Sequence, residues 1–257
     1  LEPKGPGEAD FTQPDTLDRV CRAADLRWQA FIMFNCSYAT PGWFRESGED
    51  VVHRCLEHDT DSDVRSIWCP GLKEHMERVL TAFFERYNES SALESVMFGV
   101  SGDFGESIYP AGACGWNGTY HNHAGFWCAE EPAQNDFRAW LEQRYPRLED
   151  LNRAWGTDYG SFGKTAFELP NETMSDLRFM DESDWYLEAM TAWCETWFDI
   201  RDRVARPDLP VYLCVGGGYN VPLGFDISGQ VKACARRNVW LRLTNEGSMY
   251  PGNFMGT

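Results

Sequence analysis

Residues 96–110 read VMFGVSGDFGESIYP, and in this stretch a continuous apolar run stops at a polar turn that glycines interrupt. Continuous apolar runs are typical of strands in a parallel sheet that is covered on both faces. The turn carries two acids, Asp103 and Glu106. Barrel enzymes build their active sites at the carboxyl ends of the strands. This stretch therefore indicates both a strand of a parallel sheet and a candidate active site.

Three further apolar runs precede polar or aromatic loops, near residues 30–36, 211–215 and 239–243. Segments of helical period separate the runs, and the clearest of these segments is LKEHMERVLTAFFERY at residues 72–87. Strands that are joined through helices indicate a parallel sheet. No GxGxxG or P-loop occurs at a strand-to-helix turn, so the usual signature of nucleotide sites in open sheets is missing. The pattern predicts an α/β fold of the (β/α)8 TIM-barrel type rather than an open doubly wound sheet.

The number of strands suggests that this barrel is incomplete. A complete barrel has eight strands in about 250 residues, whereas only four runs are identified here. The chain also begins with Leu1 and stops at Thr257, just after a strand end. We therefore expect about strands 3 to 6, with the first and last strands missing. Residues 1–257 would form part of a single barrel domain with a long irregular insertion at 101–133.

Composition excludes some partners and leaves other properties open. The 257 residues carry 40 acidic and 23 basic side chains, a formal charge of −17, which repels a phosphate backbone and argues against nucleic acid as a partner. No apolar run approaches the roughly 18 to 20 residues that span a bilayer, so no membrane partner is expected. The nine cysteines are odd in number and irregularly spaced, unlike a disulfide framework. Location and oligomeric state stay open.

Several segments resemble clan-A glycoside hydrolases of the β-galactosidase and β-amylase type. EPKGPGEADF (2–11), LDRVCRAADLRWQAFIMFN (17–35) and YATPGWF (38–44) resemble the stretch from the second to the third barrel strand of those families. GDFGESIYP (102–110) is similar to the glycine-flanked glutamate that ends their fourth strand. FRAWLEQRYPRLEDLNRAWGTDYGSF (137–162) resembles the segment that follows in the β-galactosidase-like group.

The resemblance implies a glycosidase that cleaves O-glycosidic bonds of an oligo- or polysaccharide, β-galactosidase-like, without a cofactor. Glu106 would be its general acid/base, because such cleavage needs a carboxylic acid to protonate the leaving oxygen. The alternative is that Asp103 and Glu106 are solvated turn residues, since acids and glycines are common in turns. A second functional class, a carbohydrate-binding or scaffold barrel without activity, also stays open. The chain alone is expected to be inactive.

The second carboxylate is expected at Glu246, in the polar cluster LTNEGS after a buried strand, where Asn245 could bond a sugar hydroxyl. The related families place this glutamate after the seventh strand, whereas NVWLRL (238–243) aligns with the sixth. In that alternative Glu246 is a subsite residue and the true partner lies beyond Thr257.

Further substrate-binding candidates lie near the predicted strand ends, where aromatic rings could cover a sugar and polar groups could bond its hydroxyls. The alternative for the aromatic residues is that they fill the core. The candidates are Asp103, Tyr109, Trp43, Trp68, Trp116, Tyr120, His121, His123, Trp127, Asn245 and Tyr250.

One loop contains a weak candidate for a metal site, formed by Cys114, His121, His123 and Cys128. Zinc binds such side chains, but its common signatures contain CxxC-type pairs that this loop lacks. Some β-galactosidase relatives carry a cysteine-bound zinc near this point, with a differently spaced cluster. We therefore expect no metal here, with the histidines lining the sugar site and the cysteines packing.

Overall fold

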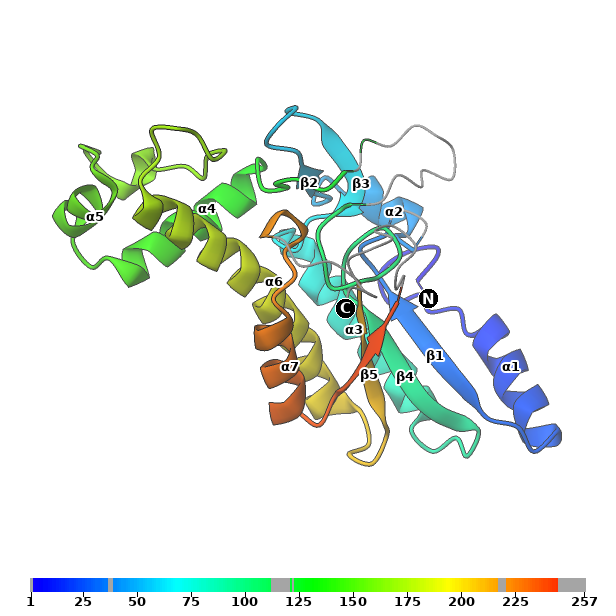
Figure 1. The fold of residues 1–257 in the computed structure, drawn as a ribbon. Coiled ribbons are helices and arrows are strands. Elements are labelled where there is room, and N and C mark those ends of the chain that lie inside the picture. The colour runs from blue at the N-terminus through cyan, green and yellow to red at the C-terminus, as the bar shows by residue number, and fades with distance from the viewer. Residues whose placement is uncertain (1, 37–38, 112–120, 122, 217–220, 245–257) are drawn as a thin grey trace.

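A computed structural model describes the protein, covering all residues except 1, 37–38, 112–120, 122, 217–220 and 245–257. Its centre is a four-stranded parallel sheet in the order β1-β4-β5-β6 (Figure 1). The strands are β1 (Trp28–Met33), β4 (Leu93–Gly99), β5 (Val211–Val215) and β6 (Trp240–Leu243). The four predicted strands and their parallel pairing are therefore confirmed.

The strand register brings all four carboxyl ends to one edge of the sheet. Phe31 pairs with Met97, Met97 pairs with Tyr212, and Tyr212 pairs with Trp240. The loops that follow the strands consequently meet at this edge, which is where the sequence predicts a site.

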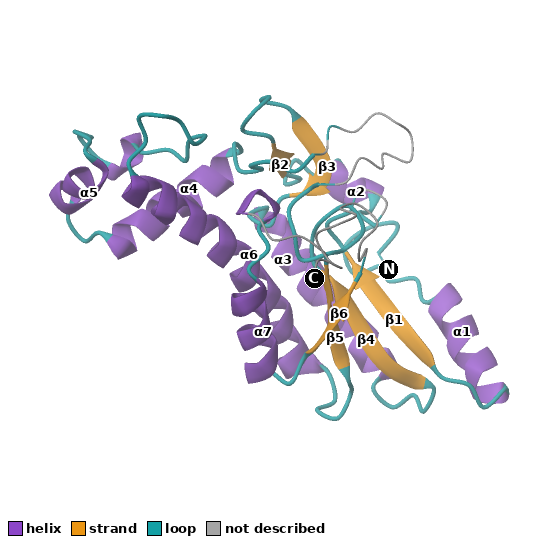
Figure 2. Cartoon of the chain, viewed as in Figure 1, coloured by secondary structure: helices purple, strands orange, loops and turns teal. Residues whose placement is uncertain are grey.

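Helices cover one face of this sheet, as Figures 1 and 2 show. Helix α3 packs against α6, and α6 packs against α7. The buried stripe of α3 is the one that the 3.6-residue period predicts, and it includes Leu72, Met76 and Val79. The helices are α1 (Thr12–Ala23), α2 (Gly42–Arg45), α3 (Pro70–Tyr87), α4 (Glu131–Arg144), α5 (Leu148–Trp155), α6 (Asp176–Val204) and α7 (Ile227–Arg236), with 3-10 turns at Phe162–Lys164 and Val221–Leu223.

The opposite face of the sheet carries exposed apolar side chains. Phe31 and Trp240 lie in one row across the strands, through Met97 and Tyr212, and both are exposed. Strands covered by helices on one face only, with apolar side chains on the other, form part of a (β/α)8 barrel, whose interior is filled by side chains from all its strands.

Helix α1 differs from the sequence prediction in the face that it buries. Helical period alone predicts a buried face with Leu17, Val20 and Cys21, but Leu17 and Val20 are exposed and only Cys21 is buried, together with Asp18. Asp18 accepts a hydrogen bond from Trp28 Nε1 at 3.0 Å, which fixes the helix against the first residue of β1. Asp15 accepts a further bond from Tyr87, so polar contacts contribute to the orientation of this helix.

A short antiparallel hairpin was not predicted from the sequence. It consists of β2 (Val52–Arg54) and β3 (Asp61–Arg65), which lie beyond the carboxyl end of β1. Both strands are short and rich in charged residues, so they lack the apolar runs by which the other strands were identified.

Helices α4 and α5 and the first half of α6 extend away from the sheet (Figure 2). They share an aromatic core, in which Trp185 packs against Phe137 and Phe167, with ring centroids 4.9 and 5.5 Å apart. Buried Asp181 accepts hydrogen bonds from Tyr145 and Trp155. Ser175 Oγ accepts a bond from Arg178 N and caps the start of α6.

None of the helices in the described part of the chain is both long enough and apolar enough to cross a membrane.

A comparison of two methionines tests the core. Met76 on α3 is fully buried, whereas Met180 on α6 is 54% exposed. We expect Met76→Ala to lower the free energy of unfolding by about 2 to 5 kcal/mol, because it leaves a cavity. Met180→Ala makes the same chemical change on a helix and should stay within about 0.5 kcal/mol. Urea denaturation measures both values, and equal losses would contradict the described packing.

Candidate functional site

The chain reverses sharply after β4, in a segment that we call the acid turn (residues 101–109). Gly102 and Gly105 have φ angles of 61° and 98°, in the left-handed region that glycine adopts without steric cost. Val100 N donates to Gly105 O at 2.9 Å and closes the reversal. The glycines thus place Glu106 directly at the carboxyl end of β4.

The side chain of Glu106 is 3% exposed. Phe104 N donates to its Oε2 at 3.1 Å. A Cβ at Gly102 would lie 3.0 Å from Glu106 Oε2, and a Cβ at Gly216 would lie 3.0 Å from Glu106 Cβ. Glu106 therefore occupies a slot between the acid turn and the end of β5, and that slot exists because both neighbours are glycine.

Backbone and amide bonds tie the acid turn to the next strand and helix. Ser107 N donates to Cys214 O on β5 at 2.9 Å. Ser107 Oγ donates to Gln230 Oε1 on α7 at 2.8 Å, and Gln230 Nε2 returns a bond to Ser107 O at 3.0 Å. Burial raises the pKa of the neighbouring Cys214 thiol to about 11, and the charge of Glu106 adds to this shift.

Asp103 supports the turn. Its Oδ2 accepts a hydrogen bond from Ala111 N at 3.0 Å, and the side chain is partly buried. This contact agrees with the interpretation of Asp103 as a turn residue.

Two of the predicted sugar-binding aromatics lie in the core instead. Tyr109 and Trp127 are both 0% exposed. Tyr109 stacks on Tyr186 of α6 with ring centroids 3.9 Å apart, and Trp127 N donates to the hydroxyl of the same tyrosine at 2.9 Å. The prediction of sugar stacking is wrong for both rings, because the loops that carry them fold back against α6.

The other predicted binding residues divide into two groups. Trp43 and Trp68 are partly exposed; Trp43 Nε1 donates to Glu2 O at 2.6 Å, and Trp68 stacks on Trp185 at 5.1 Å. The second group lies outside the described residues and comprises Trp116, Tyr120, Asn245 and Tyr250, as do the expected second carboxylate Glu246 and the metal candidate Cys114.

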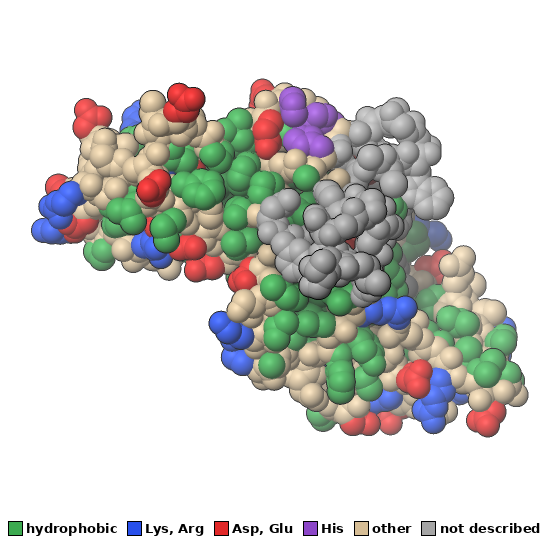
Figure 3. Space-filling view, viewed as in Figure 1, with side chains coloured by type: hydrophobic (Ala, Val, Ile, Leu, Met, Phe, Trp, Pro, Cys, Tyr) green, Lys and Arg blue, Asp and Glu red, His purple; other side chains and the backbone are tan. Residues whose placement is uncertain are grey.

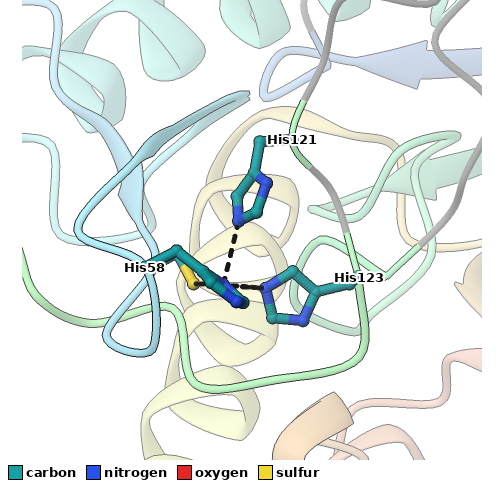
Figure 4. Close-up of side chains that lie close together, drawn as sticks. His58, His121 and His123 are labelled. Atoms are coloured by element: carbon teal, nitrogen blue, oxygen red, sulfur yellow. Dashed lines mark hydrogen bonds between the residues drawn. The ribbon is translucent and has the colours of Figure 1, made fainter.

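The histidines His121 and His123 lie in a second cluster, which we call the Cys–His cluster (Cys55, His58, His121 and His123). One ligand atom from each residue lies within 4.8 Å of the other three. Figure 4 shows the three imidazoles converging, and Figure 3 shows histidines gathered on the surface beside acidic side chains. Imidazole and thiolate are ligands that zinc prefers, so within the described part of the chain these four residues could hold a metal.

The membership of this cluster corrects the weak metal candidate. Cys128 is fully buried and is not a member, and burial raises the pKa of its thiol well above the usual range. Cys55 and His58 take part instead, from the β2–β3 hairpin. The sequence does contain a signal for this arrangement: a Cys-x-x-His pair at 55–58 and a His-x-His pair at 121–123.

Hydrogen bonds hold the hairpin against the segment before α4. Leu56 N donates to Phe126 O at 2.8 Å, and Phe126 N donates to Glu57 Oε1 at 2.9 Å. A Cβ at Gly125 would lie 2.7 Å from Glu57 Oε1 and 2.5 Å from His123 Cε1, so the close approach needs glycine.

Comparison with known sequences relates this chain to glycosidases. A family model for glycoside hydrolase family 42, described as beta-galactosidase, matches residues 115–192. The thermophilic beta-amylase of Thermoanaerobacterium thermosulfurigenes is 19% identical, over 89% of this chain and 43% of the relative. The beta-galactosidase LacZ of Heyndrickxia coagulans is 26% identical, over 82% of this chain and 30% of the relative. The chain thus spans less than half the length of these curated relatives.

Comparison with solved structures shows the fold. The catalytic domain of a beta-amylase from Paenibacillus polymyxa has a TM-score of 0.78 at 17% identity, covering 95% of this chain and 66% of that chain. A beta-galactosidase from Rahnella sp. R3 has a TM-score of 0.67 at 15% identity, covering 93% and 32%. The predicted (β/α)8-barrel fold and the resemblance to glycoside hydrolases of the β-galactosidase and β-amylase type are confirmed.

Two glycines with left-handed backbones provide a test of the slot around Glu106. Gly156 has φ 72°, and a Cβ added there would meet nothing within 4 Å, so Gly156→Ala carries only the backbone cost, roughly 1 to 2 kcal/mol. Gly102→Ala carries a similar backbone cost and also displaces the Glu106 carboxylate. We expect Gly102→Ala to lose about 1 kcal/mol more of the free energy of unfolding than Gly156→Ala in urea denaturation. Equal losses would mean that the slot is not tight.

Proposed function

We propose that this chain carries the acid/base half of a glycoside hydrolase site that cleaves O-glycosidic bonds, β-galactosidase-like, with Glu106 as the general acid/base. The observation that carries the proposal is a buried glutamate at the carboxyl end of a central barrel strand, held between Gly102 and Gly216. Active sites of (β/α)8 enzymes are built at this edge.

The position suits the chemistry of glycosidic cleavage. A carboxylic acid protonates the leaving oxygen while positive charge develops on the sugar ring. The acid must stay in one position relative to that oxygen, because a small displacement costs much of the rate. The bond from Phe104 N and the anchoring of Ser107 to β5 and α7 supply this rigidity.

The reaction needs a second carboxylate, as nucleophile or base. Glu246 stays a proposal for this role, with subsite binding as its alternative. Trp43 and Trp68, which keep exposed surface near the carboxyl edge, are the described aromatics that we propose as sugar contacts.

The names of the related proteins suggest the class of substrate. The family model and the LacZ relative favour a β-galactoside, and the beta-amylases are the other named group. A carbohydrate-binding barrel without activity stays the alternative function. A glutamate after the next strand of the barrel would favour the enzyme, and its absence would favour the binding protein.

Replacement of Glu106 tests the proposal in the protein that carries this chain. Glu106→Gln keeps the side-chain shape but cannot release a proton, so we expect hydrolysis of unactivated β-galactosides to fall by roughly 10² to 10⁴. Aryl glycosides with good leaving groups should lose less in the cleavage step, because they need less protonation. The matched control is Glu94→Gln, which changes an exposed glutamate on the same strand.

Steady-state rates on a β-galactoside disaccharide, an aryl β-galactoside and an α-glucan decide between the outcomes. Wild-type turnover by Glu106→Gln on the disaccharide would refute the acid assignment. Binding of sugar by the unmodified protein without turnover of any of the three would favour the binding protein.

A further inference from the structure

We propose that Glu2 and His75 are positioning residues for Trp43, the exposed indole that the proposed function assigns to sugar contact. The two residues form a buried pair, which we call the Glu2–His75 clamp, and it holds Trp43 in one orientation at the carboxyl edge of the sheet. The proposal deepens the proposed function and rests on it only in taking Trp43 as a ring that packs against a pyranose.

The carboxylate of Glu2 lies inside the protein, where all its partners come from the chain. Glu2 is 2% exposed. Its Oε2 lies 3.0 Å from His75 Nδ1 and 3.5 Å from Arg78 Nη2, and its Oε1 accepts a hydrogen bond from Gly7 N at 2.7 Å. Because Gly7 has a left-handed backbone, with φ 79°, residues 2–7 turn back and close on their own glutamate.

The imidazole of His75, on α3, is as buried as the carboxylate and lies among aromatic rings. Phe44 stacks on it with ring centroids 5.5 Å apart, and Phe34 and Trp43 form T-shaped contacts with it at 5.4 and 5.3 Å. Burial lowers the pKa of His75, although the charge of Glu2 opposes this shift, so the ring is neutral at neutral pH. A neutral imidazole donates one hydrogen bond, here from Nδ1 to the carboxylate.

Trp43 completes a triangle with these two residues. Its Nε1 donates to Glu2 O at 2.6 Å, and its ring contacts the imidazole of His75, which bonds the Glu2 side chain. The indole is therefore held at two points, by a polar bond at its nitrogen and by a ring contact. Of the three residues, Trp43 alone keeps partly exposed surface, which leaves it available to a ligand.

Trp43 lies in the segment next to the acid turn. It belongs to α2, which follows β1 as the acid turn follows β4, and the two strands pair in parallel. The chain between β1 and α2 touches the acid turn, since Cys36 Sγ donates weakly to Gly102 O at 3.5 Å. An indole in this segment can cover the apolar face of a sugar whose leaving oxygen faces Glu106.

Stability alone does not explain a buried pair of this kind. Removing a carboxylate and an imidazole from water costs free energy, and well-packed apolar side chains of similar volume are often as stable or more stable. A hydrogen bond is directional, however, and this one joins residues that are 73 positions apart in the chain. The clamp therefore contributes a fixed position of residues 2–7 and of the indole that they bond.

Sugar binding by variants of His75 tests the proposal. The protein that carries this chain is used with Glu106→Gln throughout, so that titration calorimetry measures binding without turnover. The ligand is whichever of a β-galactoside disaccharide and an α-glucan oligosaccharide binds. His75→Phe keeps an aromatic ring but loses the bond to Glu2, so we expect the dissociation constant to rise about tenfold. His75→Asn places an amide N–H near the position of Nδ1 and should raise it less than about threefold.

A double substitution shows whether His75 acts through Trp43. His75→Phe, added to Trp43→Ala, should weaken binding by no more than about twofold beyond Trp43→Ala alone, because the group that it positions is already gone. The matched control is Tyr145→Phe, which also keeps its ring and loses a bond to a buried carboxylate, that of Asp181, in the α4–α5 arm. It should leave the dissociation constant unchanged.

Hydrogen exchange measures the clamp without sugar. In His75→Phe, amide exchange at residues 42–47 should quicken about tenfold, whereas in Tyr145→Phe it should not change. Trp43→Phe removes only the Nε1 donor to Glu2 O, from a partly exposed side chain, and should quicken exchange at the same residues. This variant decides the matter even where His75→Phe does not fold.

Each outcome decides one part of the proposal. Additive losses of affinity in the double variant, or a loss in His75→Asn or Tyr145→Phe as large as in His75→Phe, would overturn the positioning role. Unchanged exchange at residues 42–47 in His75→Phe and Trp43→Phe would overturn the clamp. Sugar binding without turnover by the unmodified protein would refute the enzymatic function and leave the proposal standing. Binding of neither sugar would refute the role of Trp43, while the exchange data would still decide the clamp.

Discussion

The parallel pairing of β4 between β1 and β5 is the constraint on which the site depends. β4 is buried on both faces, and its register puts its carboxyl end level with the ends of its two neighbours. The described contacts around Glu106 include the bond from Phe104 N in the loop after β4 and the close approach of Gly216 after β5. Cys36, after β1, donates weakly to Gly102 O, and Cys214 on β5 accepts from Ser107 N. A shift in the pairing of β4 would therefore displace the groups that form the slot around Glu106.

The parts of the fold that the sequence predicted are those that local pattern determines. The four strands appear as mainly apolar runs, which are typical of parallel strands, and α3 appears because its stripe repeats every 3.6 residues. The acid turn was predictable for a related reason. Glycines at left-handed positions next to an acid form a signature within a few residues, and Glu106 lies where that signature and the family resemblance place it.

The parts that escaped prediction depend on contacts between distant segments. Tyr109 and Trp127 belong to loops, and nothing near them in the sequence shows that Tyr186, about 60 residues or more away, takes both into the core. The Cys–His cluster has the same origin. Cys55 and His123 are 68 residues apart, so two short pairs that are weak signals alone become a four-residue cluster only when the hairpin meets the 121–126 segment. The buried face of α1 differs from its apolar pattern, because Asp18 bonds Trp28 and Ser90 and Asp15 bonds Tyr87, all from distant segments.

Helix α6 gives the molecule a mechanical property. Its 29 residues form a rod roughly 44 Å long. Trp197, near one end, packs against Phe98 of the sheet, while Trp185, nearer the other, packs against Phe137 of the α4–α5 arm. The α4–α5 arm and the parallel sheet therefore both pack against the same continuous helix. A change in the angle between the arm and the sheet would require α6 to kink. The aromatic core of the arm is therefore expected to move together with the sheet as one rigid unit.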